Sequence, residues 1–299
     1  MRFFDLHSDT LFEAVMKGKS LDDSSLSVSF TKGKSSFSKW RECTAIWIPD
    51  KLSPSEGYEL FLQGYEMLKG ESKRFNVPVN DFENADCSFV FTLENGKIID
   101  NKIERIGELS KFGVKMMTLT WNDENCIGGG ADAQKVGLKA LGRECVKEME
   151  HKGIAVDISH ASDKLFYDVA EIAEKPLVAS HSNARSICNH RRNLTDEQII
   201  HIIKTGGLIG LNFCEYFLTA KEPHASVSDV IKHAYHILSL GGENVLAVGS
   251  DFDGAPTPSE LDSIDKIPNL AKAFKNEGFN EQIIQKILYD NAHNFFCKF

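Results

Sequence analysis

The sequence predicts an α/β protein folded as a single (β/α)8 TIM-type barrel domain over residues 1–299. Three observations predict this fold: eight short apolar runs recur along the chain, amphipathic stretches separate them, and no linker, repeat or charge block divides the chain. Continuous apolar strands joined by helices are typical of a parallel sheet buried on both faces. Eight such units in 299 residues favour closure into a barrel over an open doubly wound sheet.

The predicted strands are the apolar runs in chain order. They are Phe3–His7, Thr44–Ile48, Ser88–Leu93, Lys115–Thr120, Ile154–Ser159, Pro176–Ser180, Leu208–Phe213 and Val245–Ser250. Between them, Ser162–Glu174 has one apolar face typical of a helix. Thr195–Gln198 fits a capping box at the start of another helix, and Gly206-Gly207 ends that helix. A Rossmann fold is not indicated, because no G-x-G-x-x-G motif follows the first strand.

Charge and composition narrow the class of partner. The chain has 34 Lys and Arg against 43 Asp and Glu, a net charge of −9, so its surface should repel nucleic acids and anionic membranes. No apolar stretch approaches the roughly 18 residues that span a bilayer. Asp5, His7 and Asp9 stand where a signal peptide needs an apolar run, so we expect a cytoplasmic protein with a small-molecule partner. The seven cysteines include no C-x-x-C pair, and we expect mostly buried free thiols.

Polar side chains follow the predicted strands at the end where a parallel barrel carries its catalytic residues. Period-two alternation sends His7 and Asp9 to the same side of the first strand, so this pair can bind one metal ion. His160 and His181 follow neighbouring strands and could hold a second ion, while the two oxygens of Glu94 could bridge both ions. Asp251 follows the eighth strand.

Imidazoles and carboxylates form a ligand set suited to Zn²⁺, Mn²⁺, Fe²⁺ or Co²⁺. A metal pair about 3.5–4 Å apart can share a water, lower its pKa and stabilise the oxyanion formed when an amide is attacked. A single histidine at a strand end is more often structural, but three histidines and a glutamate at four strand ends favour a metal site. The other histidines lack this placement and are interpreted as structural or solvated: His190, His201, His224, His233, His236 and His293.

Seven stretches, spread over nearly the whole chain, resemble the renal (membrane) dipeptidase family, whose members are binuclear zinc barrels within the wider amidohydrolase group. They are Asp5-Leu-His-Ser-Asp9, Thr92-Leu-Glu-Asn-Gly96, Met117-Thr-Leu-Thr-Trp121, Val156-Asp-Ile-Ser-His160, Ala179-Ser-His-Ser-Asn-Ala-Arg185, Arg191-Arg-Asn193 and Gly249-Ser-Asp-Phe-Asp-Gly254. The resemblance implies that His7, Asp9 and Glu94 bind one zinc ion. It implies that Glu94, His160 and His181 bind the other.

The family's extracellular members use a signal peptide, disulfides and a lipid anchor, so the chain resembles the intracellular microbial branch. Homodimers are common in the family. The resemblance implies that Arg192 clamps the C-terminal carboxylate of a dipeptide, for which a guanidinium is better suited than a lysine. It also implies that Asp251 lies near the bridging hydroxide, where it takes the proton of the attacking water and passes it to the leaving amine.

The chain departs from the mammalian members at Trp121, which stands where they carry a histidine thought to polarise the scissile carbonyl. An indole donates one hydrogen bond and carries no charge. Either Asn122, Asn125 or another group supplies the missing donor, or the rate and the substrate choice differ from those of the animal enzymes. We therefore expect Trp121 and Asn122, with Arg192, to contact the substrate.

Together these patterns predict a metal-dependent dipeptidase that cleaves free dipeptides, tolerates a C-terminal D-residue and uses a metal-bridging hydroxide. One alternative is an amidohydrolase-type metalloenzyme that acts on another amide, a lactone or an N-acyl amino acid, with Trp121 marking the altered pocket. A second alternative is a non-catalytic, ligand-binding barrel. A dipeptide and a second copy of the chain are the expected partners, and neither nucleic acid nor membrane is expected.

Overall fold

The computed structural model describes residues 1–220 and 225–299, and its strands form a closed parallel barrel in sequence order. The strands are β1 (Arg2–Ser8), β2 (Lys39–Trp47), β3 (Cys87–Glu94), β4 (Met116–Thr118), β5 (Ala155–Asp157), β6 (Val178–Ala179), β7 (Leu208–Leu211) and β8 (Leu246–Val248). Each overlaps a strand predicted from the apolar runs, so the predicted (β/α)8 barrel is confirmed.

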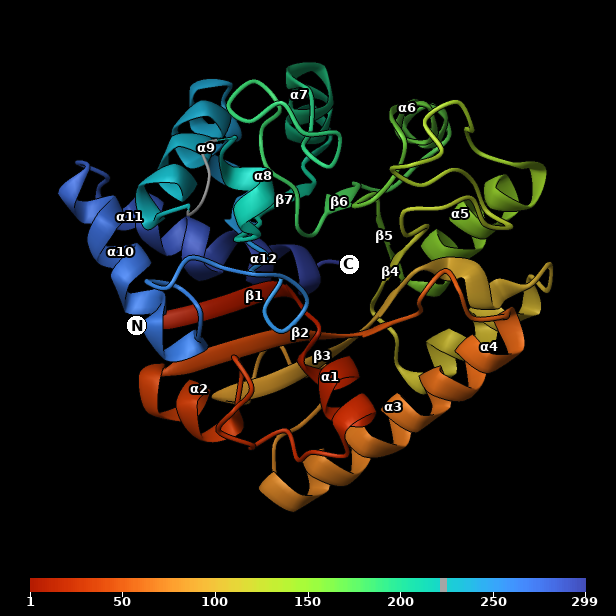
Figure 1. Ribbon diagram of the computed structural model, residues 1–299, viewed down its shortest axis with the longest axis horizontal. Helices are drawn as coiled ribbons and strands as arrows, with labels where there is room; N and C mark the ends of the chain where they lie inside the picture. The colour runs from red at the N-terminus through yellow and green to blue at the C-terminus, as the bar shows by residue number, and fades with distance from the viewer. Residues whose placement is uncertain (221–224) are drawn as a thin grey trace.

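Helices surround the barrel in chain order, as the continuous change of colour around the ring in Figure 1 shows. They are α1 (Thr10–Lys17), α2 (Phe30–Ser36), α3 (Pro54–Phe75), α4 (Glu104–Phe112), α5 (Ala140–Lys152), α6 (Asp163–Ala170), α7 (Asp196–Thr205), α8 (Glu215–Leu218), α9 (Val227–Ser239), α10 (Ile267–Asn276), α11 (Glu281–Gln285) and α12 (Asn291–Phe296). Short helical turns lie at η1 (Gly96–Ile99), η2 (Gly242–Asn244), η3 (Ile264–Lys266) and η4 (Lys286–Asp290). Among the described residues, none of these helices combines the length and apolar character needed to cross a membrane.

Capping residues set the ends of the helices that follow the site strands. Helix α6 begins after Ser162, whose hydroxyl accepts a backbone N–H, and it ends at Ala170. Helix α7 begins at the predicted capping box, in which Thr195 and Gln198 exchange side-chain and backbone hydrogen bonds. It ends at Gly206, whose φ of 73° lies in the left-handed region that glycine adopts without strain.

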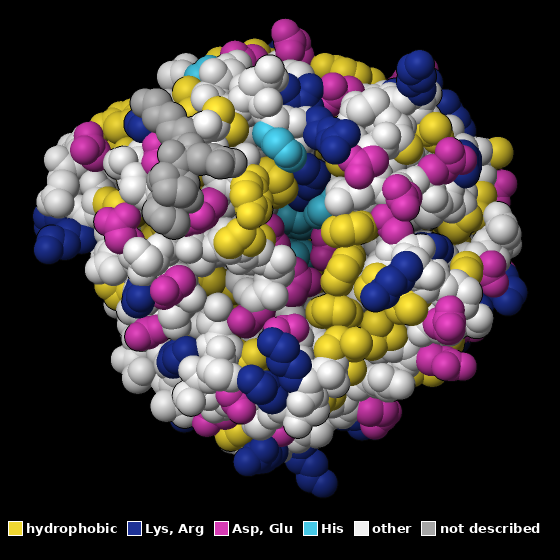
Figure 2. Space-filling model, viewed as in Figure 1, with side chains coloured by type: hydrophobic (Ala, Val, Ile, Leu, Met, Phe, Trp, Pro, Cys, Tyr) yellow, Lys and Arg dark blue, Asp and Glu magenta, His cyan; other side chains and the backbone are white. Residues whose placement is uncertain are grey.

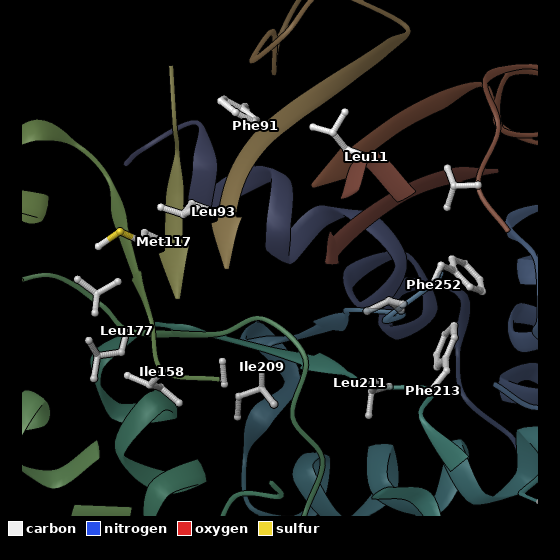
Figure 3. Close-up of a cluster of buried hydrophobic side chains, with 14 of the residues drawn as sticks. Leu11, Phe91, Leu93, Met117, Ile158, Leu177, Ile209, Leu211, Phe213 and Phe252 are labelled. Atoms are coloured by element: carbon white, nitrogen blue, oxygen red, sulfur yellow. The ribbon is translucent and has the colours of Figure 1, made fainter. Parts of the chain in front are cut away.

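The apolar core has two layers. The inner layer takes side chains from all eight strands and packs against Tyr289, Ala292 and Phe296 of the C-terminal segment: Phe4, Leu6, Cys43, Val90, Met116, Ala155, Val178, Leu208 and Ala247. The outer layer packs the strands against the helices, and Figure 3 shows part of it around β3, β4 and β7. The seven cysteines are free thiols and only Cys297 is exposed, which confirms the prediction for them.

Strand β2 begins earlier than its apolar run indicated, at Lys39 rather than Thr44. The added residues include Arg41, which is fully buried. Its guanidinium donates to four backbone carbonyls at 2.6–3.2 Å, those of Trp40, Phe82, Ala85 and Asp86. A buried charge is tolerated when hydrogen bonds replace its hydration, so these carbonyls allow a charged residue inside a strand.

Candidate metal and substrate site

A cavity of about 470 Å³ lies where the loops after the strands meet. Figure 2 shows it as a hollow with histidine and acidic side chains inside it and basic and apolar side chains at its edge. The cavity is lined by seven of the predicted site residues: Asp9, Glu94, Trp121, Asn122, His160, Arg192 and Asp251. The other two, His7 and His181, are each 1% exposed and do not line it.

Glu94, the last residue of β3, directs its two carboxylate oxygens towards different imidazoles. Its Oε2 lies 3.6 Å from Nε2 of His7. Its Oε1 lies 3.0 Å from Nε2 of His160 and 3.7 Å from Nε2 of His181. One carboxylate therefore faces two sets of nitrogen ligands, which is the arrangement needed to bridge two metal ions.

Three buried ligand atoms make no hydrogen bond within the described part of the chain: Nε2 of His7, Nε2 of His181 and Oδ1 of Asp9. Buried polar atoms are almost always paired. Two groups of potential ligand atoms each lie within 4.8 Å of one another, one made of His7, Glu94 and His181, the other of His7, Asp9 and Asp251. The residues present therefore fit divalent metal ions.

Hydrogen bonds on the far side of two imidazoles leave their Nε2 atoms available as ligands. Nδ1 of His160 lies 2.9 Å from Oδ1 of Asn122 and so donates to it. Nδ1 of His181 lies 2.7 Å from Oγ of Ser180, which donates to Asp157 at 2.6 Å and can therefore accept the imidazole proton. Such outer partners fix the tautomer and the ring orientation of a metal-binding histidine. Asn122, which the sequence predicts as a substrate contact, orients His160 in this structure.

Burial and the neighbouring charges shift the pKa values of Glu94 and His7. Burial raises the pKa of Glu94 well above its usual range, and the carboxylates of Asp9 and Asp251 add to the rise. Burial by itself would lower the pKa of His7, but Glu94, Asp9 and Asp251 raise it to about 10. Without another cation, the cluster therefore holds a proton on His7, and a bound metal ion would take the place of that positive charge.

The other two imidazoles are in the neutral form that binds metal. Burial lowers the pKa of His160 well below its usual range, helped by the positive charges of Arg192 and His7. Burial likewise lowers the pKa of His181, helped by His7, Arg192 and His160. Neutral imidazoles bind metal without first losing a proton.

His7 and Asp9 come together for a different reason than period-two alternation. The pairing of β1 with β2 shifts register between Asp5 and Ser8, and Asp9 is the N-cap of α1 rather than a strand residue. The turn still brings Oδ2 of Asp9 to 3.5 Å from Nε2 of His7. Gly254 packs so closely against the carboxylate of Asp9 that a Cβ at position 254 would lie 1.9 Å from Oδ2 of Asp9.

The chain adopts unusual backbone angles at the loop residues of the site. His160 and Asp251 have φ of 65° and 64°, values that non-glycine residues rarely adopt and that cluster at functional sites. Oδ2 of Asp251 accepts from Nδ2 of Asn212 at 3.0 Å. Sequence reasoning missed Asn212, although it is a polar residue at the end of the seventh predicted strand, the signal that identified the others.

One wall of the cavity is aromatic. The ring of Trp121 lies 4.9 Å from that of Trp47, which in turn lies 5.0 Å from the ring of Phe12. All three line the cavity, although the sequence indicated only Trp121. Asn125 does not supply the missing donor, because its side-chain amide is buried and donates to Asn95 and Leu119.

Arg192 also lines the cavity and is 6% exposed. Its guanidinium carbon lies 5.4 Å from the centre of the Phe217 ring, and its Nε and Nη2 have no hydrogen-bond partner among the described residues. Burial lowers its pKa, while Asp251 and Glu94 act in the opposite direction. Arg185 on the same loop makes a bidentate pair with Asp163 at 2.7 and 2.8 Å.

The prediction that His190 is structural or solvated was incomplete, since it also lines the cavity beside Arg192. The pattern did not reveal this, because His190 stands in a loop rather than at a strand end. His233 is fully buried, and His236 pairs with Asp196. His224 lies outside the described residues.

A family model described as membrane dipeptidase, peptidase family M19, matches residues 1–297. An uncharacterized protein of the pqqA 5′ region of Klebsiella pneumoniae is 33% identical over 219 residues, which cover 70% of this chain and 81% of that protein. An uncharacterized dipeptidase of Schizosaccharomyces pombe is 31% identical over 229 residues, 68% of this chain, but the match spans only 55% of that protein.

Solved structures share the fold. A metallopeptidase of family M19 described as dipeptidase AC superposes with a TM-score of 0.92 at 24% identity, covering 99% of this chain and 98% of that one. A Rhodobacter sphaeroides metallopeptidase, liganded with a phosphinate mimic of the dipeptide L-Ala-D-Ala, gives a TM-score of 0.92 at 23% identity with the same coverage. At these identities the superpositions establish the barrel.

Proposed function

Because the chain belongs to the membrane dipeptidase family, metallopeptidases of family M19 that hydrolyse peptide bonds, we propose that it cleaves free dipeptides and that Arg192 selects them by their C-terminal carboxylate. The observation that carries the proposal is the buried guanidinium of Arg192, whose Nε and Nη2 have no partner in the described part of the chain and which lines the same cavity as Glu94. A guanidinium in this state lacks an anion, and a carboxylate is the anion whose geometry matches its fork of donors.

The proposed metal ligands are those predicted from the sequence. His7, Asp9 and Glu94 would hold one zinc ion, and Glu94, His160 and His181 the other, although the same donors suit other divalent transition metals. When bound, such a pair polarises the scissile carbonyl and supplies a hydroxide nucleophile at neutral pH. The directions of the two Glu94 oxygens and the unpaired Nε2 atoms of His7 and His181 support this assignment.

Asp251 is the proposed proton carrier. Its Oδ2 is held by Asn212, while its Oδ1 lies 4.0 Å from Nε2 of His7 and so faces the ligand cluster. Burial raises the pKa of Asp251, which brings it closer to the range useful for a general base. We assign to Asp251 the uptake of the attacking water's proton and its delivery to the leaving amine.

Selection of dipeptides follows from the position of Arg192. A longer peptide would place a neutral amide against the guanidinium and leave the charge unpaired, which costs binding energy. Tolerance of a D-residue at the C-terminal position also belongs to the proposal. Its support is the ligand of the Rhodobacter sphaeroides structure, which mimics a dipeptide ending in D-Ala.

Release of free amino acids from L-Ala-D-Ala and L-Ala-L-Ala by zinc-reconstituted protein tests the proposal, with a chelated sample as the control. We expect turnover of both dipeptides, lost on chelation and restored by zinc. No turnover by protein that carries two zinc ions per chain would contradict the dipeptidase assignment. Turnover of L-Ala-L-Ala alone would contradict the tolerance of D-residues.

The aromatic wall favours a second candidate, hydrolysis of N-acyl amino acids or of another amide or lactone. Trp121 lies 5.7 Å from the ring of His160, ring centre to ring centre, and presents an apolar surface beside the proposed metal site. An N-acyl amino acid would offer Arg192 the same carboxylate and this wall an apolar acyl group. A panel of dipeptides, N-acyl amino acids and lactones separates the two, since a higher kcat/KM for the latter groups would favour the second candidate.

A further inference from the structure

His190 is held in one tautomer by the segment that carries Arg192. The backbone N–H of Arg192 donates to Nδ1 of His190 at 3.2 Å. Because Nδ1 accepts this bond, the imidazole proton resides on Nε2. In the described part of the chain no hydrogen bond is made by that Nε2–H, so His190 presents an unused donor.

His190 and Arg192 also share one support. The ring of His190 lies 4.6 Å from the ring of Phe217 at an angle of 32°. The guanidinium carbon of Arg192 lies 5.4 Å from the centre of the same ring. All three residues line the cavity, so Phe217 fixes two donor groups side by side on one wall.

We propose that His190 is a specificity-determining residue that donates its Nε2–H to the substrate carboxylate held by Arg192. This inference rests on the proposed function and extends it to a second donor. A carboxylate has lone pairs for about four hydrogen bonds, so it can accept from both groups at once. The neighbouring arginines add to burial in lowering the pKa of His190, which keeps the imidazole neutral and Nδ1 an acceptor.

Two substitutions separate a donor role from a packing role. His190→Phe keeps a ring against Phe217 and removes the donor, whereas His190→Gln keeps an N–H donor and removes the ring. A donor role predicts a KM for L-Ala-L-Ala raised about 10- to 100-fold in His190→Phe, the worth of one charge-assisted hydrogen bond, and near wild-type values in His190→Gln. In both variants kcat and zinc content should stay close to wild type. A packing role predicts the reverse: a KM near wild type in His190→Phe and a raised KM in His190→Gln.

His201→Phe is the matched control, because His201 lies on α7 and does not line the cavity. A KM for His190→Phe equal to that of this control would overturn the inference. If the wild-type protein cleaves no dipeptide, the proposed function fails. The affinities of wild type and His190→Phe for a phosphinate mimic of L-Ala-D-Ala, measured by calorimetry, then replace the comparison of KM values. Equal affinity in wild type and His190→Phe, or no binding by the wild type, would then overturn the role of His190.

Discussion

Replacement of Arg192 by methionine should abolish efficient dipeptide cleavage without destabilising the protein. The side chain is buried, and two of its guanidinium nitrogens lack partners in the described structure. Methionine has a similar length and no charge. Arg185, seven positions earlier on the same loop, provides the opposite case because both its Nη atoms pair with Asp163.

The magnitude follows from the two unpaired nitrogens. Two charge-assisted hydrogen bonds to a substrate carboxylate, at about 1.5–3 kcal/mol each, amount to roughly 3–6 kcal/mol. At about 1.4 kcal/mol for each factor of ten, kcat/KM should fall about 10²- to 10⁴-fold in Arg192→Met. A buried charge with two unpaired nitrogens has lost hydration without full compensation, a cost that an apolar group of similar volume does not have, so the free energy of unfolding should not decrease in Arg192→Met. Arg185→Met should instead lose roughly 1–2 kcal/mol of stability with little change in kcat/KM.

Steady-state kinetics on L-Ala-D-Ala and urea unfolding, both with zinc-loaded protein of verified metal content, measure the two quantities. The reasoning requires the two variants to separate, one losing activity and the other losing stability. Unchanged kcat/KM in Arg192→Met would remove this residue from substrate binding. A loss of stability in Arg192→Met as large as that in Arg185→Met would show that the guanidinium is paired in the free protein.

Two further predictions concern a glycine beside a proposed metal ligand and a buried histidine that affects the pH dependence of stability. Gly254→Ala places a Cβ 1.9 Å from Oδ2 of Asp9, so the zinc affinity, measured by chelator competition, should fall about 10- to 100-fold. The control is Gly107→Ala, whose Cβ would meet nothing closer than 3.9 Å and which should keep wild-type affinity. Equal zinc affinity in both variants would contradict the role of Gly254. Burial lowers the pKa of His233 to about 4, so below the unfolded-state value of about 6.5 the unfolded chain binds the extra proton and native stability falls as the pH falls. Urea unfolding should therefore show a loss of about 2 kcal/mol between pH 7 and pH 5 that His233→Gln lacks, and parallel losses in both proteins would refute the assignment.

Much of the fold was predictable because its signals are local. Apolar runs mark the strands, and the capping box at Thr195 marks the start of α7. The prediction was least accurate for β2, where Arg41 interrupts the apolar pattern. Its charge is compensated by carbonyls more than 40 positions away in the chain as well as by a neighbouring one, and local periodicity carries no information about such partners.

The residues of the candidate site were likewise predictable only where their signal is local. The residue types expected at the strand ends, such as Glu94 and His181, were predictable because a parallel barrel gathers those ends at one rim. His190 was not identified, since it stands in a loop rather than at a strand end, and Asn212 was overlooked although it lies at the end of the seventh predicted strand. Asp9 lies close to His7 as predicted but for a different geometric reason, because a register shift in β1 replaces simple alternation.

The sequence by itself determined the barrel, the order of its strands and the chemical character of the side chains at its rim, since these depend on periodicity and on residue type. Only the tertiary structure decided which atoms face one another. It directed the two oxygens of Glu94 to different imidazoles, left Nε and Nη2 of Arg192 without partners among the described residues and placed His190 against the same Phe217 ring. These relations join residues far apart in the chain, and they are set by barrel closure and loop packing rather than by local pattern.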